Sequence, residues 1–122
     1  MREILFQGIR RDNGEWIEGG IAQNYFVDGD ICIISDRGEI VSVDPATVGQ
    51  YIGIPDKNGK KIFEGNIVRY KDRVGVVRYW SAGFAIHFAG AEAPEIGLLC
   101  NWLRGYIEVI GNSADRPGLK ED

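Results

Sequence analysis

The segment from Asn66 to Trp80, NIVRYKDRVGVVRYW, gives the clearest indication of fold class in this 122-residue chain. It contains two runs rich in β-branched and aromatic residues, Asn66–Lys71 and Val74–Trp80, separated only by Asp72-Arg73. Such residues favour strands, and a short polar break between two such runs favours a hairpin. The segment therefore predicts two antiparallel strands joined by a short turn.

The same pattern extends in both directions along the chain. Phe84, Ile86 and Phe88 alternate with other residues, which predicts a strand with these three side chains on one face. Asp12-Asn13-Gly14 is typical of a hairpin turn, because Asn and Gly tolerate a positive φ. Further strands or extended segments are expected at 4–9, 15–21, 24–27, 30–35, 39–43, 49–54, 61–64 and 105–111. Residues 44–48 fit one helical turn, and 96–103 fit either a strand or a short helix.

These elements predict a mainly β protein with an antiparallel meander and at most one or two short helical turns. The 17 glycines, spread along the chain, fit many short strands joined by turns. We expect a single β-rich domain over 1–111, with a meander in 1–56 and an SH3-like small barrel in 57–111. The barrel is an analogy from strand count and glycine placement. Residues 112–122 are expected to form a flexible polar tail.

The composition is that of an ordinary globular protein, with 44% hydrophobic and 26% charged residues. The opening Met1-Arg2-Glu3-Ile4 lacks the apolar run of a signal peptide, and no apolar stretch is long enough to cross a bilayer. We therefore expect a cytoplasmic protein of a host bacterial cell, with no membrane contact. Cys32 and Cys100 lie among apolar residues and are interpreted as buried free thiols rather than as a disulfide.

No catalytic or cofactor motif is present. The sequence has no P-loop, no GxGxxG after a strand, no GxSxG and no HExxH. His87 is the only histidine and has no local partner for general-base work. The pairs Asp28/Asp30 and Glu92/Glu95 lie in turns and loops, where solvated carboxylates are common. We expect no enzyme activity, no cofactor and no metal.

Charge is unevenly distributed along the chain. Residues 57–78 hold seven cationic side chains and two acids, a net charge of +5, whereas residues 12–56 hold nine acids and one cation, a net charge of −8. A basic stretch interleaved with aromatic residues could bind nucleic acid. Alternatively, the acidic half neutralises it within the chain or across a homo-oligomer, and the overall charge of −4 would repel nucleic acid. The candidate recognition surface comprises Lys57, Asn58, Lys60, Lys61, Arg69, Lys71, Arg73, Arg78, Tyr79 and Trp80.

One long segment resembles a known family. Residues 48–68 read VGQYIGIPDKNGKKIFEGNIV, which is similar to the pattern GQ(Y/F)TGLKDKNGK(E/K)I(Y/F)EGDIV of the YopX family of phage- and prophage-encoded proteins. The opening REILFQG at 2–8 and the closing IEVIGN at 107–112 resemble the family's REIKFRG and xEVIGN. The chain departs from the pattern at Gln7, Ile52 and Asn66, where a basic residue, Thr and Asp are usual.

The resemblance implies a phage-associated, β-rich protein that forms oligomers, with no activity or catalytic residue to carry over. The turn Asp56–Lys60 is interpreted either as a folding device or as a displayed recognition loop. Our leading hypothesis is a self-associating protein-interaction module that acts on itself or on a host or phage protein. A nucleic-acid-binding module that uses residues 57–78 is the second hypothesis, and an unrecognised enzyme is the third.

Overall fold

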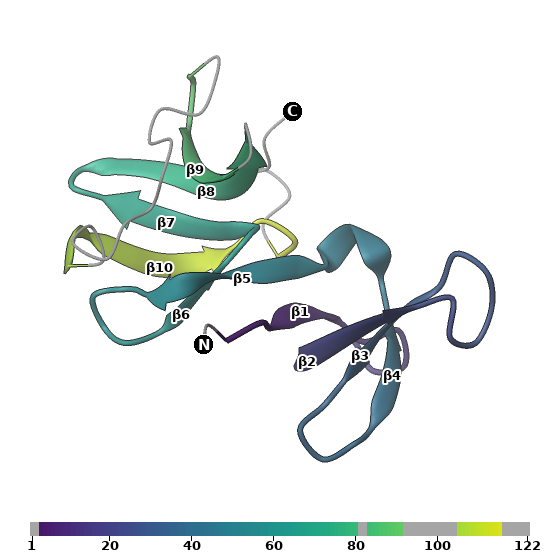
Figure 1. Ribbon diagram of the computed structural model, residues 1–122. Coiled ribbons are helices and arrows are strands. Elements are labelled where there is room, and N and C mark those ends of the chain that lie inside the picture. The colour runs from purple at the N-terminus through teal and green to yellow at the C-terminus, as the bar shows by residue number, and fades with distance from the viewer. Residues whose placement is uncertain (1–2, 81–82, 92–104, 116–122) are drawn as a thin grey trace. The chain divides into compact units, whose positions relative to one another are not determined.

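The computed structural model describes residues 3–80, 83–91 and 105–115 (Figure 1). Ten strands and the 3₁₀ turn η1 have both ends in these ranges, and Gly105-Tyr106 also adopt a 3₁₀ conformation. Their bounds are β1 Phe6–Ile9, β2 Trp16–Gln23, β3 Ile31–Ile34, β4 Ile40–Val43, η1 Pro45–Thr47, β5 Gly49–Pro55, β6 Lys61–Phe63, β7 Asn66–Tyr70, β8 Arg73–Trp80, β9 Gly83–Phe88 and β10 Ile107–Asn112.

The chain divides into two compact units, residues 1–51 and 52–122, with the boundary inside β5. This division falls a few residues before the expected change from meander to barrel segment at 56/57. Whether residues 1–111 behave as a single domain stays a prediction.

In the first unit the strand order is β4-β3-β2-β1-β5, and every pairing with a resolved register is antiparallel. The turn at Asp12-Asn13-Gly14 is confirmed as the β1–β2 connection: Gly14 has φ +76°, and the Arg10 N–H donates to the Glu15 carbonyl at 2.8 Å. Arg10 also forms a bridge with Val43 of β4. The buried apolar side chains of this unit come mainly from β3 and β4 and include Cys32, Ile33, Val41 and Val43.

The strand expected at Asn24–Val27 is not present, and that prediction was wrong. β2 runs on to Gln23, and the chain then bends through an exposed loop before β3 begins at Ile31. The physical reason is Asn24, which adopts φ +59°, a left-handed conformation that breaks an extended strand. The helical turn predicted at 44–48 is confirmed as η1, with the Asp44 carboxylate accepting the Ala46 N–H at 3.1 Å.

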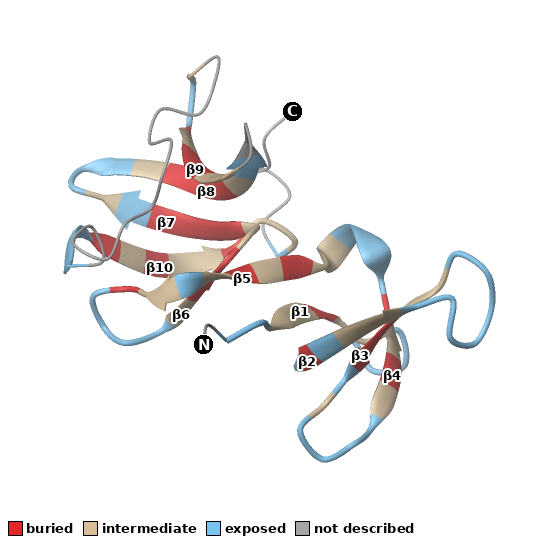
Figure 2. Cartoon of the chain, in the orientation of Figure 1, coloured by how far each residue is buried: buried red, intermediate tan, exposed pale blue. Residues whose placement is uncertain are grey.

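The second unit contains a four-stranded antiparallel sheet in the order β10-β7-β8-β9, whose strands lie side by side in Figure 1. The hairpin predicted from Asn66–Trp80 is confirmed, although its turn is Lys71-Asp72 rather than Asp72-Arg73. A hydrophobic cluster packs on one face, and the strands carrying it are marked in Figure 2. Its buried members are Ile62, Val68, Val77, Ile86, Phe88, Ile107 and Val109.

β9 carries Phe84, Ile86 and Phe88 on one face as predicted, with Ile86 and Phe88 buried in this cluster and Phe84 half-buried. On the other face His87 is half-buried, but Ala85 is buried as well. On the neighbouring strand, Gly75 lies opposite Phe88. A Cβ at Gly75 would meet the Ile86 side chain at 2.6 Å and the His87 carbonyl oxygen at 2.8 Å. The close approach of β8 and β9 therefore requires a glycine here.

The predicted class, mainly β with antiparallel sheets and almost no helix, is confirmed for the described residues. Both strand orders in those ranges are open, so the SH3-like barrel remains unconfirmed. The predicted segment 96–103 and Cys100 lie outside the described residues. β10 continues to Asn112, so Asn112 belongs to a strand and not to the expected polar tail, and residues 116–122 also lie outside the described residues.

Candidate functional site: a clamped turn, a basic edge and an aromatic tip

The turn Asp56–Lys60 is built around a buried carboxylate. Asp56 is 1% exposed, and its Oδ1 accepts the N–H groups of Asn58 at 2.8 Å and Lys60 at 2.9 Å. Gly59 adopts φ +83° and closes the turn through its N–H, which donates to the Asp56 carbonyl at 3.0 Å. The turn is thus held by one side chain that satisfies backbone donors at several points.

The same carboxylate joins this turn to the last strand. Asp56 Oδ2 accepts the Val109 N–H at 2.9 Å, and the Lys57 N–H donates to the Ile107 carbonyl at 2.9 Å. Burial raises the pKa of Asp56, but the hydrogen bonds from three backbone N–H groups outweigh burial, so its pKa lies below the ordinary value. These contacts favour the interpretation of the turn as a folding device, with the side chains of Lys57, Asn58 and Lys60 exposed around it.

A second polar junction follows at Asn66. Asn66 is buried, and its Oδ1 accepts the Phe63 N–H at 2.7 Å across the turn between β6 and β7. A carboxylate would accept this hydrogen bond equally well, which explains why Asn can stand where the family pattern has Asp. Gly65, with φ +94°, completes this turn, and its carbonyl accepts the Ser113 N–H at 2.9 Å.

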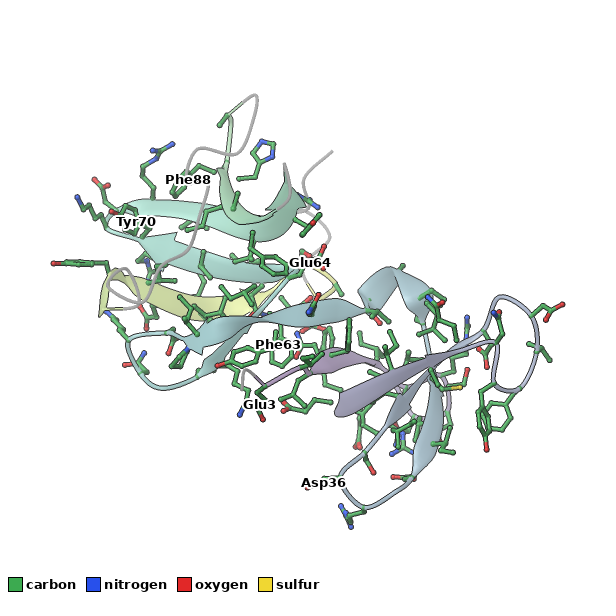
Figure 3. All side chains as sticks on the ribbon, in the orientation of Figure 1. Glu3, Asp36, Phe63, Glu64, Tyr70 and Phe88 are labelled. Carbon is green, nitrogen blue, oxygen red and sulfur yellow. The ribbon has the colours of Figure 1, made fainter. Side chains whose placement is uncertain are left out.

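Four of the predicted cationic residues gather near one end of the β7–β8 hairpin. Lys57 and Arg69 both approach Glu108 Oε1, at 3.9 Å and 3.2 Å. The Lys71 ammonium lies 5.4 Å from the centre of the Tyr70 ring, and the Arg73 guanidinium lies 3.8 Å from the centre of the Phe88 ring. Tyr70 and Phe88 are labelled in Figure 3, where their parts of β7 and β9 lie in the same region of the sheet. We call Lys57, Arg69, Lys71 and Arg73, with Tyr70, the basic edge.

The basic edge does not present all its cations on one face of the sheet. Arg73 pairs in register with Tyr70, so both side chains point to the face that carries the hydrophobic cluster. Arg69 precedes Tyr70 in the same strand and points to the opposite face, where it meets Glu108. The remaining predicted residues lie elsewhere. Lys61 starts β6, Arg78 is half-buried in β8, Tyr79 is exposed, and Trp80 ends β8 with its side chain outside the description.

The sequence analysis missed a second feature, in the loop between β2 and β3. Tyr25, Phe26 and Val27 are 57%, 59% and 65% exposed, so three consecutive apolar side chains face solvent. Figure 2 shows this loop as exposed along its length. The Tyr25 and Phe26 rings pack edge to face with their centres 5.0 Å apart. We call these three residues the aromatic tip.

The loop that carries the aromatic tip is tied at its base. Asn24 Oδ1 accepts the Gly29 N–H at 2.6 Å, and the Asn24 N–H donates to the Asp30 carbonyl at 2.8 Å. The Asp30 N–H donates in turn to the Val27 carbonyl at 3.1 Å. The signal in the sequence was three apolar residues enclosed by the turn formers Asn24 and Asp28-Gly29, a pattern that favours a closed loop over a strand.

Three other residues considered in the sequence analysis, His87, Cys32 and Asp30, lie within the described residues. The Nε2 atom of the His87 ring lies 2.7 Å from the carbonyl oxygen of Ala91. Cys32 is confirmed as a buried free thiol, and burial raises its pKa. The Asp30 carboxylate accepts a hydrogen bond from the Ser42 hydroxyl group at 2.9 Å.

Within the described ranges no group of His, Cys, Asp or Glu is arranged to hold a metal ion, and no helix is long and apolar enough to span a membrane.

The fold and these surfaces define a mainly antiparallel β protein whose buried polar residues hold turns together. The sequence profile of the family described as YopX protein matches residues 13–121, so the chain belongs to this family and the resemblance is confirmed. The crystal structure of protein EF1440 from Enterococcus faecalis superimposes with a TM-score of 0.59 at 21% identity, over 99% of this chain and 100% of that one. That likeness shows a shared fold alone. No curated protein is significantly similar to the chain.

Proposed function

We propose that this chain is a non-catalytic, self-associating interaction module of phage or prophage origin that acts by binding protein. The observation that carries the proposal is the aromatic tip, three consecutive exposed apolar side chains on a tied loop. Contiguous exposed apolar residues mark interaction surfaces on soluble proteins, and aromatic anchors supply much of the binding energy at interfaces. The unequal charge of the two units supports self-association, since opposite potentials attract across an interface.

Sedimentation velocity over a concentration series tests this proposal. We expect the mean sedimentation coefficient of the wild-type chain to rise with concentration, and the rise to be smaller at high salt because ions screen charge pairs. A single monomeric species at every concentration from micromolar to millimolar would contradict self-association.

Nucleic-acid binding is the second candidate, and the basic edge favours it. Tyr106, which is 56% exposed, directly precedes Ile107, the register partner of Tyr70, so an exposed ring lies next to the cations. Against this, Glu108 pairs with two of the cations, and Arg69 and Arg73 point to opposite faces. Fluorescence anisotropy with a labelled single-stranded oligonucleotide should show affinity that falls steeply with salt if this candidate holds.

The proposed absence of catalysis rests on the sequence, which contains none of the common catalytic motifs. An unrecognised enzyme remains the third candidate. A screen of the purified chain against generic esterase, phosphatase and nuclease substrates would support that candidate if turnover co-purified with the protein.

A further inference from the structure

We propose that the aromatic tip of one copy of this chain docks on the basic edge of a second copy. This inference rests on the proposed self-association and names the two surfaces that meet. It commits to a heterologous contact, in which each copy offers a different surface to its neighbour.

The aromatic tip has the properties of a docking element. Its rings are exposed, and the loop is held before binding by two hydrogen bonds, one from the Gly29 N–H to Asn24 Oδ1 and one from the Asn24 N–H to the Asp30 carbonyl. A preorganised loop loses less conformational entropy when it binds than a free one. Tyr25 and Phe26 thus offer ring faces at a low entropic cost.

The basic edge is the complementary surface by its chemistry. Its Lys71 and Arg73 each lie over one aromatic ring of their own chain, and both residues are exposed to solvent. A second set of rings, Tyr25 and Phe26 of another copy, would contact the outer side of the same cations. Tyr106 adds an exposed aromatic surface beside them.

Charge supports the same pairing. The aromatic tip is followed directly by the exposed Asp28, and its unit, residues 1–51, carries nine acids against four cations. The segment 57–78 that supplies the basic edge carries seven cations against two acids. Contact between two tips would bring like charges together, whereas contact between tip and edge brings opposite charges together.

Two single variants and their mixture test the proposal by sedimentation velocity. Phe26→Ser removes one ring of the aromatic tip but leaves the basic edge intact. Lys71→Asp reverses one charge of the basic edge, and Asp tolerates the φ of +57° found at this position. Each variant alone is expected to associate at least about tenfold more weakly than the wild type. Their equimolar mixture should regain a 1:1 heterodimer, because one partner keeps an intact tip and the other keeps an intact edge.

Matched controls separate this contact from general effects. Ile4→Ser removes an exposed apolar side chain of the same unit, 58% exposed, and should leave association unchanged. Thermal unfolding of each variant verifies that it is folded. No heterodimer from two folded, weakened variants would overturn the tip-to-edge contact. Wild-type-like association of folded Phe26→Ser would also overturn it, while leaving self-association in place. A wild-type chain that is monomeric throughout would overturn the proposed self-association itself.

Discussion

The Asp56 carboxylate accepts the backbone N–H of Val109 at 2.9 Å, across 53 residues of chain. This hydrogen bond ties the turn between β5 and β6 to the last strand of the second unit. Asp56 also accepts hydrogen bonds from the N–H groups of Asn58 and Lys60. One side chain therefore fixes both the shape of the turn and the attachment of the turn to β10.

Replacement of Asp56 by Ala should destabilise the second unit strongly. Buried N–H groups would lose their acceptor, and each unsatisfied donor costs about 1–3 kcal/mol. We expect a loss of roughly 3 kcal/mol or more in the free energy of unfolding, measured by urea denaturation. Lys57→Ala, which alters an exposed side chain of the same turn, is the matched control and should change stability by less than about 0.5 kcal/mol. Equal effects of the two substitutions would contradict the role given to Asp56.

Asp56 should also make stability depend on pH. Its pKa in the folded chain lies below the ordinary value, so its contribution is complete above the unfolded pKa of about 4 and is lost as the pH falls through the folded pKa. We expect the unfolding midpoint to fall on acidification below about pH 4. The decrease should be smaller in Asp56→Asn, which cannot titrate. Parallel pH profiles for wild type and Asp56→Asn would argue against this linkage.

Replacement of Asn66 by Asp should be tolerated, whereas replacement by Ala should not. Asn66 acts through Oδ1, which accepts the Phe63 N–H, and Asp offers an equivalent oxygen. We expect Asn66→Asp to unfold near the wild-type midpoint and Asn66→Ala to lose about 1–3 kcal/mol. Thermal unfolding followed by circular dichroism checks both. An Asp variant as unstable as the Ala variant would show that the side-chain amide of Asn66 is needed as well.

The loop of the aromatic tip should loosen when Asn24 is changed. Asn24→Ala removes the acceptor for Gly29 and places a residue that disfavours φ +59°, at a cost of about 1–2 kcal/mol locally. Asn24→Asp keeps the side-chain oxygen that accepts the Gly29 N–H and tolerates the positive φ, so it is the control. Amide hydrogen exchange in residues 24–30 should accelerate in the Ala variant alone. Unchanged exchange there would mean that Asn24 does not hold the loop.

Much of the fold could be predicted because hairpin turns are encoded locally. Asp12-Asn13-Gly14 and Asp56–Lys60 combine residues that favour turns with glycines of positive φ, so their positions follow from the sequence. Asn24 was misread because an isolated Asn can belong to a strand or adopt a left-handed conformation. The turn formers on both sides of the apolar residues 25–27 favour the loop, and the hydrogen bond from the Gly29 N–H to Asn24 Oδ1 closes it.

The candidate site was harder to predict for a related reason. The expected turn at Asp72-Arg73 makes Arg73 a turn residue, whereas the observed turn at Lys71-Asp72 makes it the first residue of β8, opposite Tyr70. The separation of Arg69 from Arg73 therefore could not be derived with certainty from the pattern. The contact of Asp56 with Val109 depends on the packing of strands distant in sequence, for which a single sequence carries no local signal.

Photo-cross-linking from the aromatic tip tests the central claim most directly. Phe26 would be replaced by the photoreactive aromatic p-benzoylphenylalanine, and the variant mixed with an equal amount of ¹⁵N-labelled wild-type chain before irradiation. We expect mass spectrometry to identify cross-links from residue 26 of one copy to labelled peptides that contain residues 69–73 of another. Cross-links that join tip to tip, or none between copies at concentrations where the chain associates, would contradict docking of the aromatic tip on the basic edge.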